Sequence, residues 1–278
     1  MRVRYSFGSR HTGHIANILK QRGKYPDVVR KVIDISDIIL EVLDARFIEE
    51  TRNFELENKI KDLGKKIIFV LNKCDLVDVS KLEKELDRKM YPYVFVSSKT
   101  GQGAKDLRNR IKIEAKRVEM EEKIRIQVGI IGYPNTGKSS LINLITRKGS
   151  AKISKQAGFT KGLQKIRLTD EIQILDTPGV IPDEKYSNSK EENLSFDAMV
   201  GARSFNDVKN PEDIVYFLMQ KNSKKIEKFY EIDAKGDSQI LIEELGKKKG
   251  FLKKAGETNI DRTARAILRD WQEGKIRK

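Results

Sequence analysis

An eight-residue stretch, Gly132–Ser139, constrains the fold of this chain more than any other feature. It has the pattern Gly-x-x-x-x-Gly-Lys-Ser, follows an apolar run over 124–131 and leads into a helical pattern over 139–145. A strand, a glycine-rich loop and a helix in this order are typical of a phosphate-binding loop, in which backbone N–H groups and the helix N-terminus face a polyphosphate. The residues expected to contact phosphate are Asn135, Thr136, Gly137, Lys138, Ser139 and Ser140. Among them, Lys138 would reach the β- and γ-phosphates and Ser139 would hold magnesium.

The length and the cysteine content narrow the class of protein. A chain of 278 residues fits one large or two modest domains. No apolar run is long enough to span a bilayer, and the basic first residues precede no apolar segment of signal-peptide length. We therefore expect a cytoplasmic protein without a membrane partner. The single cysteine, Cys74, excludes an internal disulfide and a thiolate-rich metal site.

The chain is strongly basic. It holds 56 Lys and Arg against 41 Asp and Glu, a net charge of +15. The basic residues gather in two stretches, 1–31 and 147–167, and the second contains no acidic residue. Clustered charge of this kind favours an anionic partner such as nucleic acid, and a generally charged surface is the alternative.

A second motif indicates which nucleotide the loop binds. The continuous apolar strand over 65–71 ends in Asn72-Lys73-Cys74-Asp75. A carboxylate accepts hydrogen bonds from guanine N1–H and N2–H₂ together, and adenine lacks that donor pair, so Asp75 would select GTP over ATP. Asn72 and Lys73 would support the base pocket and tie it to the phosphate loop. A plain polar turn is the alternative reading.

Two further segments complete the predicted site. After the strand over 93–96, Ser97 and Ser98 stand where backbone amides of a tight loop contact guanine O6, with Lys99 beside the ring. In the polar stretch 149–162, Thr160 is expected to supply a second hydroxyl on the magnesium side. Strands over 163–168 and 172–175 then lead to Asp176-Thr177-Pro178-Gly179. There, Asp176 would hold magnesium through a water, and the Gly179 N–H would sense the γ-phosphate.

The order of these motifs is unusual. The guanine motifs precede the phosphate loop, whereas the phosphate loop comes first in an ordinary small GTPase. Because motifs at strand ends can meet under another connectivity, we expect a circularly permuted α/β domain: a mostly parallel sheet with helices on both faces. The predicted organisation is a basic segment (1–30), this nucleotide-binding domain (31–185) and a helical RNA-binding domain (186–278).

The last helix, expected over 260–273, has an apolar face and a separate basic stripe. The stripe consists of Arg262, Arg265 and Arg269 at spacings of three and four. We interpret it as an RNA-facing edge, and an ordinary solvated face is equally consistent with the pattern.

The motif order, together with Asp44-Ala45-Arg46 and a tail over 246–250 and 270–275, resembles the circularly permuted GTPases of the YlqF/YawG (RbgA-like) group. The resemblance implies a GTP-hydrolysing switch in ribosome assembly, chiefly of the large subunit, whose partners are GTP or GDP, ribosomal RNA and the large-subunit precursor. We expect it to act as a monomer. Two rivals remain: a nucleotide-gated RNA-binding placeholder with negligible turnover, and a tRNA-acting or signalling GTPase.

The resemblance also implies how hydrolysis proceeds. Ras-like enzymes place a glutamine where this chain has Val180, so intrinsic hydrolysis is expected to be slow. Asn135 matches the phosphate-loop asparagine that helps to bind potassium in related GTPases. His14 resembles a leader histidine proposed to position water, although helix capping or RNA contact is the alternative. The predicted catalytic set is thus His14, Lys138, Thr160 and Gly179.

Overall fold

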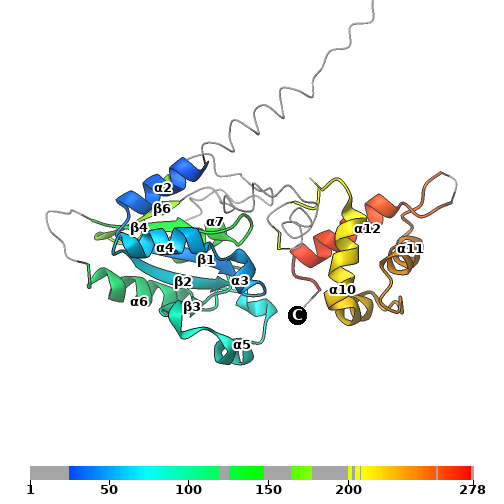
Figure 1. Cartoon of the computed structure of the whole chain (residues 1–278), viewed down its shortest axis with the longest axis horizontal. Helices are drawn as coiled ribbons and strands as arrows, with labels where there is room; N and C mark the ends of the chain where they lie inside the picture. Colours follow the sequence, from blue (N-terminus) through cyan, green and yellow to red (C-terminus); the bar gives the residue numbers. More distant parts are fainter. Residues whose placement is uncertain are drawn as a thin grey trace, which may run out of the picture.

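The computed structural model describes residues 25–118, 125–146, 164–176, 200–201, 204–206, 208–254 and 256–276. These residues form an α/β unit and a helical unit, which lie side by side (Figure 1). None of the described helices is long and apolar enough to cross a membrane. The domain boundary predicted near residue 185 lies outside the described residues.

A six-stranded sheet forms the centre of the α/β unit. Its strands are β1 (Ile38–Asp44), β2 (Lys66–Asn72), β3 (Tyr93–Phe95), β4 (Ile126–Ile131), β5 (Gln164–Arg167) and β6 (Ile172–Asp176). They lie in the order β3-β2-β1-β4-β6-β5, and every neighbouring pair is parallel except β5 with β6. The mostly parallel sheet predicted from the sequence is confirmed.

Helices cover both faces of this sheet. One face packs on α2 (Tyr25–Ile35), α3 (Ile48–Thr51) and α4 (Phe54–Asp62), and the other on α6 (Ala104–Ala115) and α7 (Lys138–Thr146). Along β1, Leu40 and Val42 belong to the α6/α7 core while Ile39 and Leu43 belong to the α2/α3/α4 core. This period of two is the alternation of a strand that is buried on both faces.

The helical unit contains α10 (Pro211–Tyr230), α11 (Ser238–Lys248) and α12 (Ile260–Gln272). The helix α10 begins after its cap residue, Asn210, and has Pro211 in its first turn, where proline lacks only an N–H that the helix leaves unused. The core of the unit also includes Phe47 and Tyr133, which belong to the α/β unit. The two units therefore share one apolar core next to the phosphate loop.

The sequence over 80–90 predicts a single helix, and the structure differs there. It has α5 (Val79–Glu85), followed by a separate 3-10 turn, Arg88–Met90. Leu86 has extended backbone angles, and the Asp87 carboxylate accepts a hydrogen bond from the Lys89 N–H to start the turn. An aspartate that caps a new turn competes with helix continuation, which explains the difference.

Glu41 interrupts the apolar run with which β1 leads up to its last residue, Asp44. Its side chain is fully buried. Oε1 accepts a hydrogen bond from the Asn53 N–H at 3.0 Å, and Oε2 has no partner among the described residues. Burial, reinforced by the nearby Glu57 carboxylate, raises the pKa of Glu41 to about 8. The folded protein therefore favours the protonated form of this carboxyl group.

Glu41→Gln is expected to change how stability depends on pH. A folded-state pKa above the ordinary glutamate value of ~4.3 means that folding takes up a proton, so the contribution of Glu41 to the free energy of unfolding declines as the pH rises from that value towards 8. The glutamine variant cannot ionise and keeps an acceptor for the Asn53 N–H. Between pH 5 and pH 8.5 the wild type should lose at least ~2 kcal/mol more stability than this variant.

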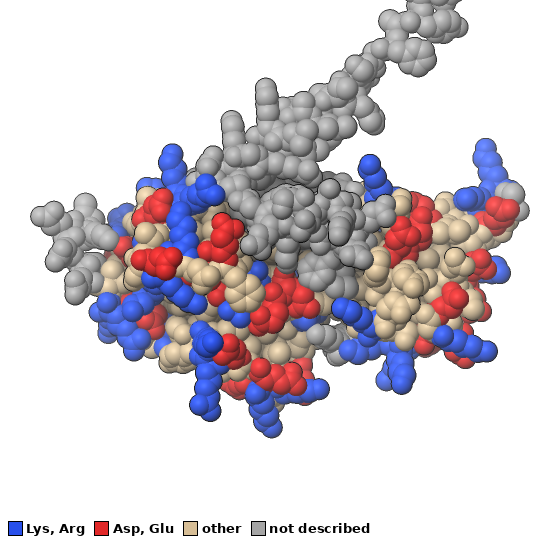
Figure 2. All heavy atoms as spheres, viewed as in Figure 1, with Lys and Arg blue, Asp and Glu red and all other residues tan. Residues whose placement is uncertain are grey.

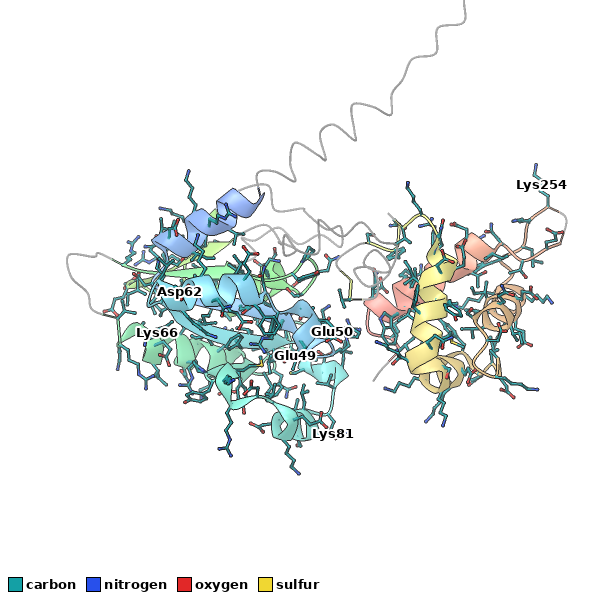
Figure 3. The ribbon with its side chains drawn as sticks, in the orientation of Figure 1. Glu49, Glu50, Asp62, Lys66, Lys81 and Lys254 are labelled. Atoms are coloured by element: carbon teal, nitrogen blue, oxygen red, sulfur yellow. The ribbon has the colours of Figure 1, made fainter. Side chains whose placement is uncertain are left out.

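Chemical denaturation at both pH values measures the difference between the two proteins. Glu49→Gln is the matched control, because Glu49 is an exposed residue on α3 (Figure 3). It should follow the wild type at both pH values. Parallel pH profiles of the wild type and Glu41→Gln would contradict the protonation of Glu41 in the folded state.

Candidate nucleotide-binding site

The strand order brings the predicted motifs to one edge of the sheet. Because β2, β4 and β6 run parallel, their carboxyl ends lie at the same edge. Asn72 ends β2, the phosphate loop follows β4, and Asp176 ends β6. The connection reverses direction between β1 and β4, and ligands of open α/β sheets bind at such a point.

The phosphate loop wraps around the head of Lys138. The ammonium Nζ donates to the carbonyl oxygens of Gly132 at 3.0 Å and Tyr133 at 2.9 Å, and Lys138 is buried. The Thr136 hydroxyl also donates to the Tyr133 carbonyl, at 3.0 Å. The helix α7 begins at Lys138, so the predicted Ser139 and Ser140 stand in its first turn, where backbone N–H groups face outward.

The guanine motif contacts the phosphate loop directly. The Asn72 side-chain Nδ2 donates to the Thr136 carbonyl at 2.7 Å, across 64 positions of sequence. Gly137 has a φ of +99°, and a Cβ atom there would lie 2.3 Å from the same Nδ2. Only glycine allows this approach. The structure thus brings together the two motifs in the way the sequence predicted.

The serines of the second guanine segment hold the first one in place. The Ser97 hydroxyl donates to Asp75 Oδ1 at 2.6 Å, which leaves Oδ2 of the half-buried carboxylate for a further donor. The Ser98 N–H and hydroxyl both donate to Asn72 Oδ1, at 3.0 and 2.9 Å. Lys99 is exposed, and its expected place beside the base stays a prediction. These hydrogen bonds bring together Asn72, Asp75, Ser97 and Ser98 of the six predicted guanine-site residues.

Two residues that sequence reasoning assigned no role complete this arrangement. Asp44 is fully buried at the end of β1, and its Oδ2 accepts from Lys73 Nζ at 2.7 Å and from Arg46 Nη2 at 2.8 Å. Burial would raise the pKa of Asp44, but Lys73 and Arg46 outweigh burial and hold that pKa well below its usual range. The signal in the sequence was an Asp-x-Arg placed directly after a buried strand.

The predicted magnesium ligands Ser139 and Asp176 lie on two different elements. Ser139 is in the first turn of α7 and Asp176 is the last residue of β6, so their backbones lie at the sheet edge that carries the phosphate loop. Serine and aspartate supply the hard oxygen donors that Mg²⁺ prefers, and magnesium binding by these two residues stays a prediction. His14, Thr160, Gly179 and Val180 lie outside the described residues, as do most of the basic clusters in 1–31 and 147–167.

Asn135 and the arginine stripe make contacts within the protein. Asn135 has a φ of +58°, and its Nδ2 donates to the Gly201 carbonyl at 2.6 Å. Arg265 donates to the carbonyls of Phe205 and Val208, which fixes that segment on α12. Arg262 and Arg269 are exposed. RNA contact by the stripe stays a prediction, and Arg265 has a structural role besides.

On the face drawn in Figure 2, Lys and Arg side chains project from both units among Asp and Glu. In Figure 3, Lys254 marks the end of the helical unit that lies away from the α/β unit. The basic charge of the described residues on this face is therefore distributed rather than confined to one unit.

Known proteins match both the sequence and the fold. The family described as 50S ribosome-binding GTPase matches residues 127–247, a range that begins at β4 and leaves the guanine motifs before it. A GTP-binding protein of Methanocaldococcus jannaschii is 41% identical over 253 residues, which are 90% of this chain and 65% of that protein. Nuclear GTP-binding protein NUG1 of Saccharomyces cerevisiae is 32% identical over 92% of this chain and 56% of its own length.

Among solved structures, GNP-bound YlqF from T. maritima aligns with a TM-score of 0.65 and 22% identity, over 91% of this chain and 95% of that one. At this identity the likeness shows the fold. The chain spans about two-thirds or less of the length of the curated relatives named above.

Proposed function

We propose that the chain binds and hydrolyses GTP and acts as a nucleotide-dependent switch in assembly of the large ribosomal subunit, because residues 127–247 match the family described as 50S ribosome-binding GTPase, its relatives are GTP-binding proteins and its fold is that of YlqF. The observation that carries this proposal is the hydrogen bond from Asn72 to the Thr136 carbonyl. It joins a guanine-selective motif to a phosphate loop at one sheet edge, as binding of a single guanine nucleotide requires.

Each motif has a separate task in this proposal. The Asp75 carboxylate, oriented by Ser97, accepts the N1–H and N2–H₂ donors of guanine. The loop amides and Lys138 hold the phosphates, and their positive charge stabilises the charge that develops on the transferred phosphoryl group. A magnesium ion held by Ser139 and Asp176, with Thr160 joining once a γ-phosphate is present, would neutralise further negative charge. The Gly179 N–H would then sense the γ-phosphate, so that the conformation of the chain depends on whether GTP or GDP is bound.

Turnover is proposed to be slow in the free protein and faster on the ribosomal particle. Val180 has no group that can orient a water molecule. The proposal assigns that task to His14 and assigns extra charge stabilisation to a potassium ion beside Asn135. His14 and the potassium ion act only when they are correctly placed at the γ-phosphate. Binding to the ribosomal particle would fix them there.

The proposed partners follow from the net charge of the chain and from its sequence similarity to known proteins. The net charge of +15 favours ribosomal RNA as the anionic surface, contacted in part by Arg262 and Arg269. Relatives are named nuclear or nucleolar GTP-binding proteins, for example nucleolar GTP-binding protein 2 of Saccharomyces cerevisiae. For this chain we propose a monomer that works in the cytoplasm on the large-subunit precursor.

A turnover assay tests the function. Phosphate release from GTP and from ATP is measured with and without purified large-subunit particles, in potassium and in sodium buffer. We expect phosphate release from GTP and not from ATP. The particles and potassium should each raise its rate. Negligible release under every condition, with tight GTP binding, would favour the RNA-binding placeholder. Stimulation by tRNA instead of particles would favour a tRNA-acting GTPase.

A further inference from the structure

The carboxylate of Asp44 joins the guanine motif to a second basic residue. Lys73 and Arg46 meet on the same oxygen, Oδ2, while Arg46 Nε and its backbone N–H donate to Oδ1 at 3.0 and 3.1 Å. Asp44 is fully buried, and the exposed fraction of Arg46 is 6%. Such charge-assisted bonds in a buried setting have a narrow geometry, so a shift of Arg46 would also shift Lys73.

Arg46 also reaches the helical unit. Its Nη1 donates to the backbone carbonyl of Trp271 at 3.0 Å, across 225 positions of sequence. This carbonyl lies in the last turn of α12, where it also accepts the Gly274 N–H at 3.0 Å and shares the partial negative charge of a helix C-terminus. The guanidinium therefore supplies both a donor and a favourable charge to the end of α12.

Two apolar contacts lie beside this hydrogen bond. The Phe47 and Trp271 rings stand 6.1 Å apart, centroid to centroid. A Cβ atom at Gly274, which follows the C-cap of α12, would lie 2.4 Å from Leu76 Cδ1. Leu76 directly follows Asp75 of the guanine motif. The C-terminal end of α12 and the residues just after it therefore contact two neighbours of the guanine motif, Arg46 and Leu76.

We propose that Asp44 and Arg46 form a positioning pair that couples occupancy of the guanine pocket to the C-terminal end of α12. Lys73 takes its position for the purine ring from Asp44, and Arg46 ties the same carboxylate to the Trp271 carbonyl. By linkage, a base that orders Lys73 orders α12, and an α12 held in place raises the affinity for the base by the same factor. GDP engages this link as well as GTP, because both carry the guanine base. The inference rests on the proposed guanine-nucleotide binding and adds a second path to the helical unit beside the γ-phosphate switch.

Hydrogen exchange on the full-length protein tests the coupling. In the wild type, GDP is expected to slow exchange of the backbone amides over 268–276. In Arg46→Gln saturated with GDP this protection should be lost, and the affinity for GDP should be about tenfold lower than in the wild type. Comparing nucleotide-bound with nucleotide-free protein of the same variant cancels any general loss of stability.

Arg52→Gln is the matched control. Arg52 is also a buried arginine, and it donates to Glu57 from Nε and Nη2, both at 2.8 Å, on the side of α4. Its variant should keep the affinity for GDP and the protection of 268–276. Arg46→Lys, which retains a cation for Asp44, should bind GDP more tightly than Arg46→Gln.

The outcomes separate this inference from the proposed function. A wild type that does not bind GDP would overturn the function itself. A wild type that binds GDP with unchanged exchange at 268–276, or an Arg46→Gln variant that keeps both protection and affinity, would overturn the coupling alone.

Discussion

Asp75→Asn should lower the affinity for GTP by at least ~100-fold and create a preference for xanthosine triphosphate. The carboxylate is the acceptor for two guanine donors, and an asparagine turns an amide N–H₂ towards guanine N2–H₂, so that two donors face each other. Xanthine carries a carbonyl at that position, which accepts the new donor. Competition binding with GTP, xanthosine triphosphate and ATP measures the change.

Asp78→Asn is the matched control for that substitution. Asp78 is exposed three residues further along the chain, and its carboxylate caps α5 by accepting the Lys81 N–H. The change in charge and size is the same, but base preference should stay with GTP. If Asp75→Asn also kept its preference for GTP, the assignment of the guanine pocket would be wrong.

Lys138→Ala should lower the affinity for both GDP and GTP by at least ~100-fold and abolish phosphate release. The ammonium is held inside the loop by the Gly132 and Tyr133 carbonyls, so it is placed for the phosphates rather than for the base. The variant should therefore retain its preference for guanine over adenine in whatever binding remains. Asp75→Asn is expected to show the opposite pattern, with preference altered and phosphate contacts kept.

Lys81→Ala controls for the loss of one lysine. Lys81 is exposed on α5 (Figure 3). Titration of both variants with a fluorescent GDP analogue compares them directly. Normal binding by Lys138→Ala would contradict the role of the loop in phosphate binding.

Much of the site was predictable because its motifs are local in sequence. The loop over 132–139 and the guanine motif over 72–75 each carry their chemistry within eight residues or fewer, and each follows an apolar strand. Parallel strands bring such segments to one edge, whatever their order along the chain. The contact between Asn72 and Thr136 follows from these rules, and so does the permuted sheet.

The contacts that join the two units could not be predicted in this way. The bond from Arg46 to the Trp271 carbonyl ends on a backbone atom, and any residue type supplies a backbone carbonyl. Tyr133 occupies a variable position of the phosphate-loop pattern, yet its ring is buried in the core of the helical unit. Likewise, the three arginines on α12 are spaced to lie on one helix face. That spacing did not predict that Arg265 would donate to the backbone carbonyls of Phe205 and Val208.

Sucrose-gradient sedimentation with large-subunit particles tests the proposed switch most directly. The protein is mixed with the particles in the presence of GDP, a non-hydrolysable GTP analogue or no nucleotide. The proposal predicts co-migration with the particles in the GTP-analogue state and release in the GDP state. Free protein in all three states, from a preparation that binds GTP, would contradict a role on the large subunit.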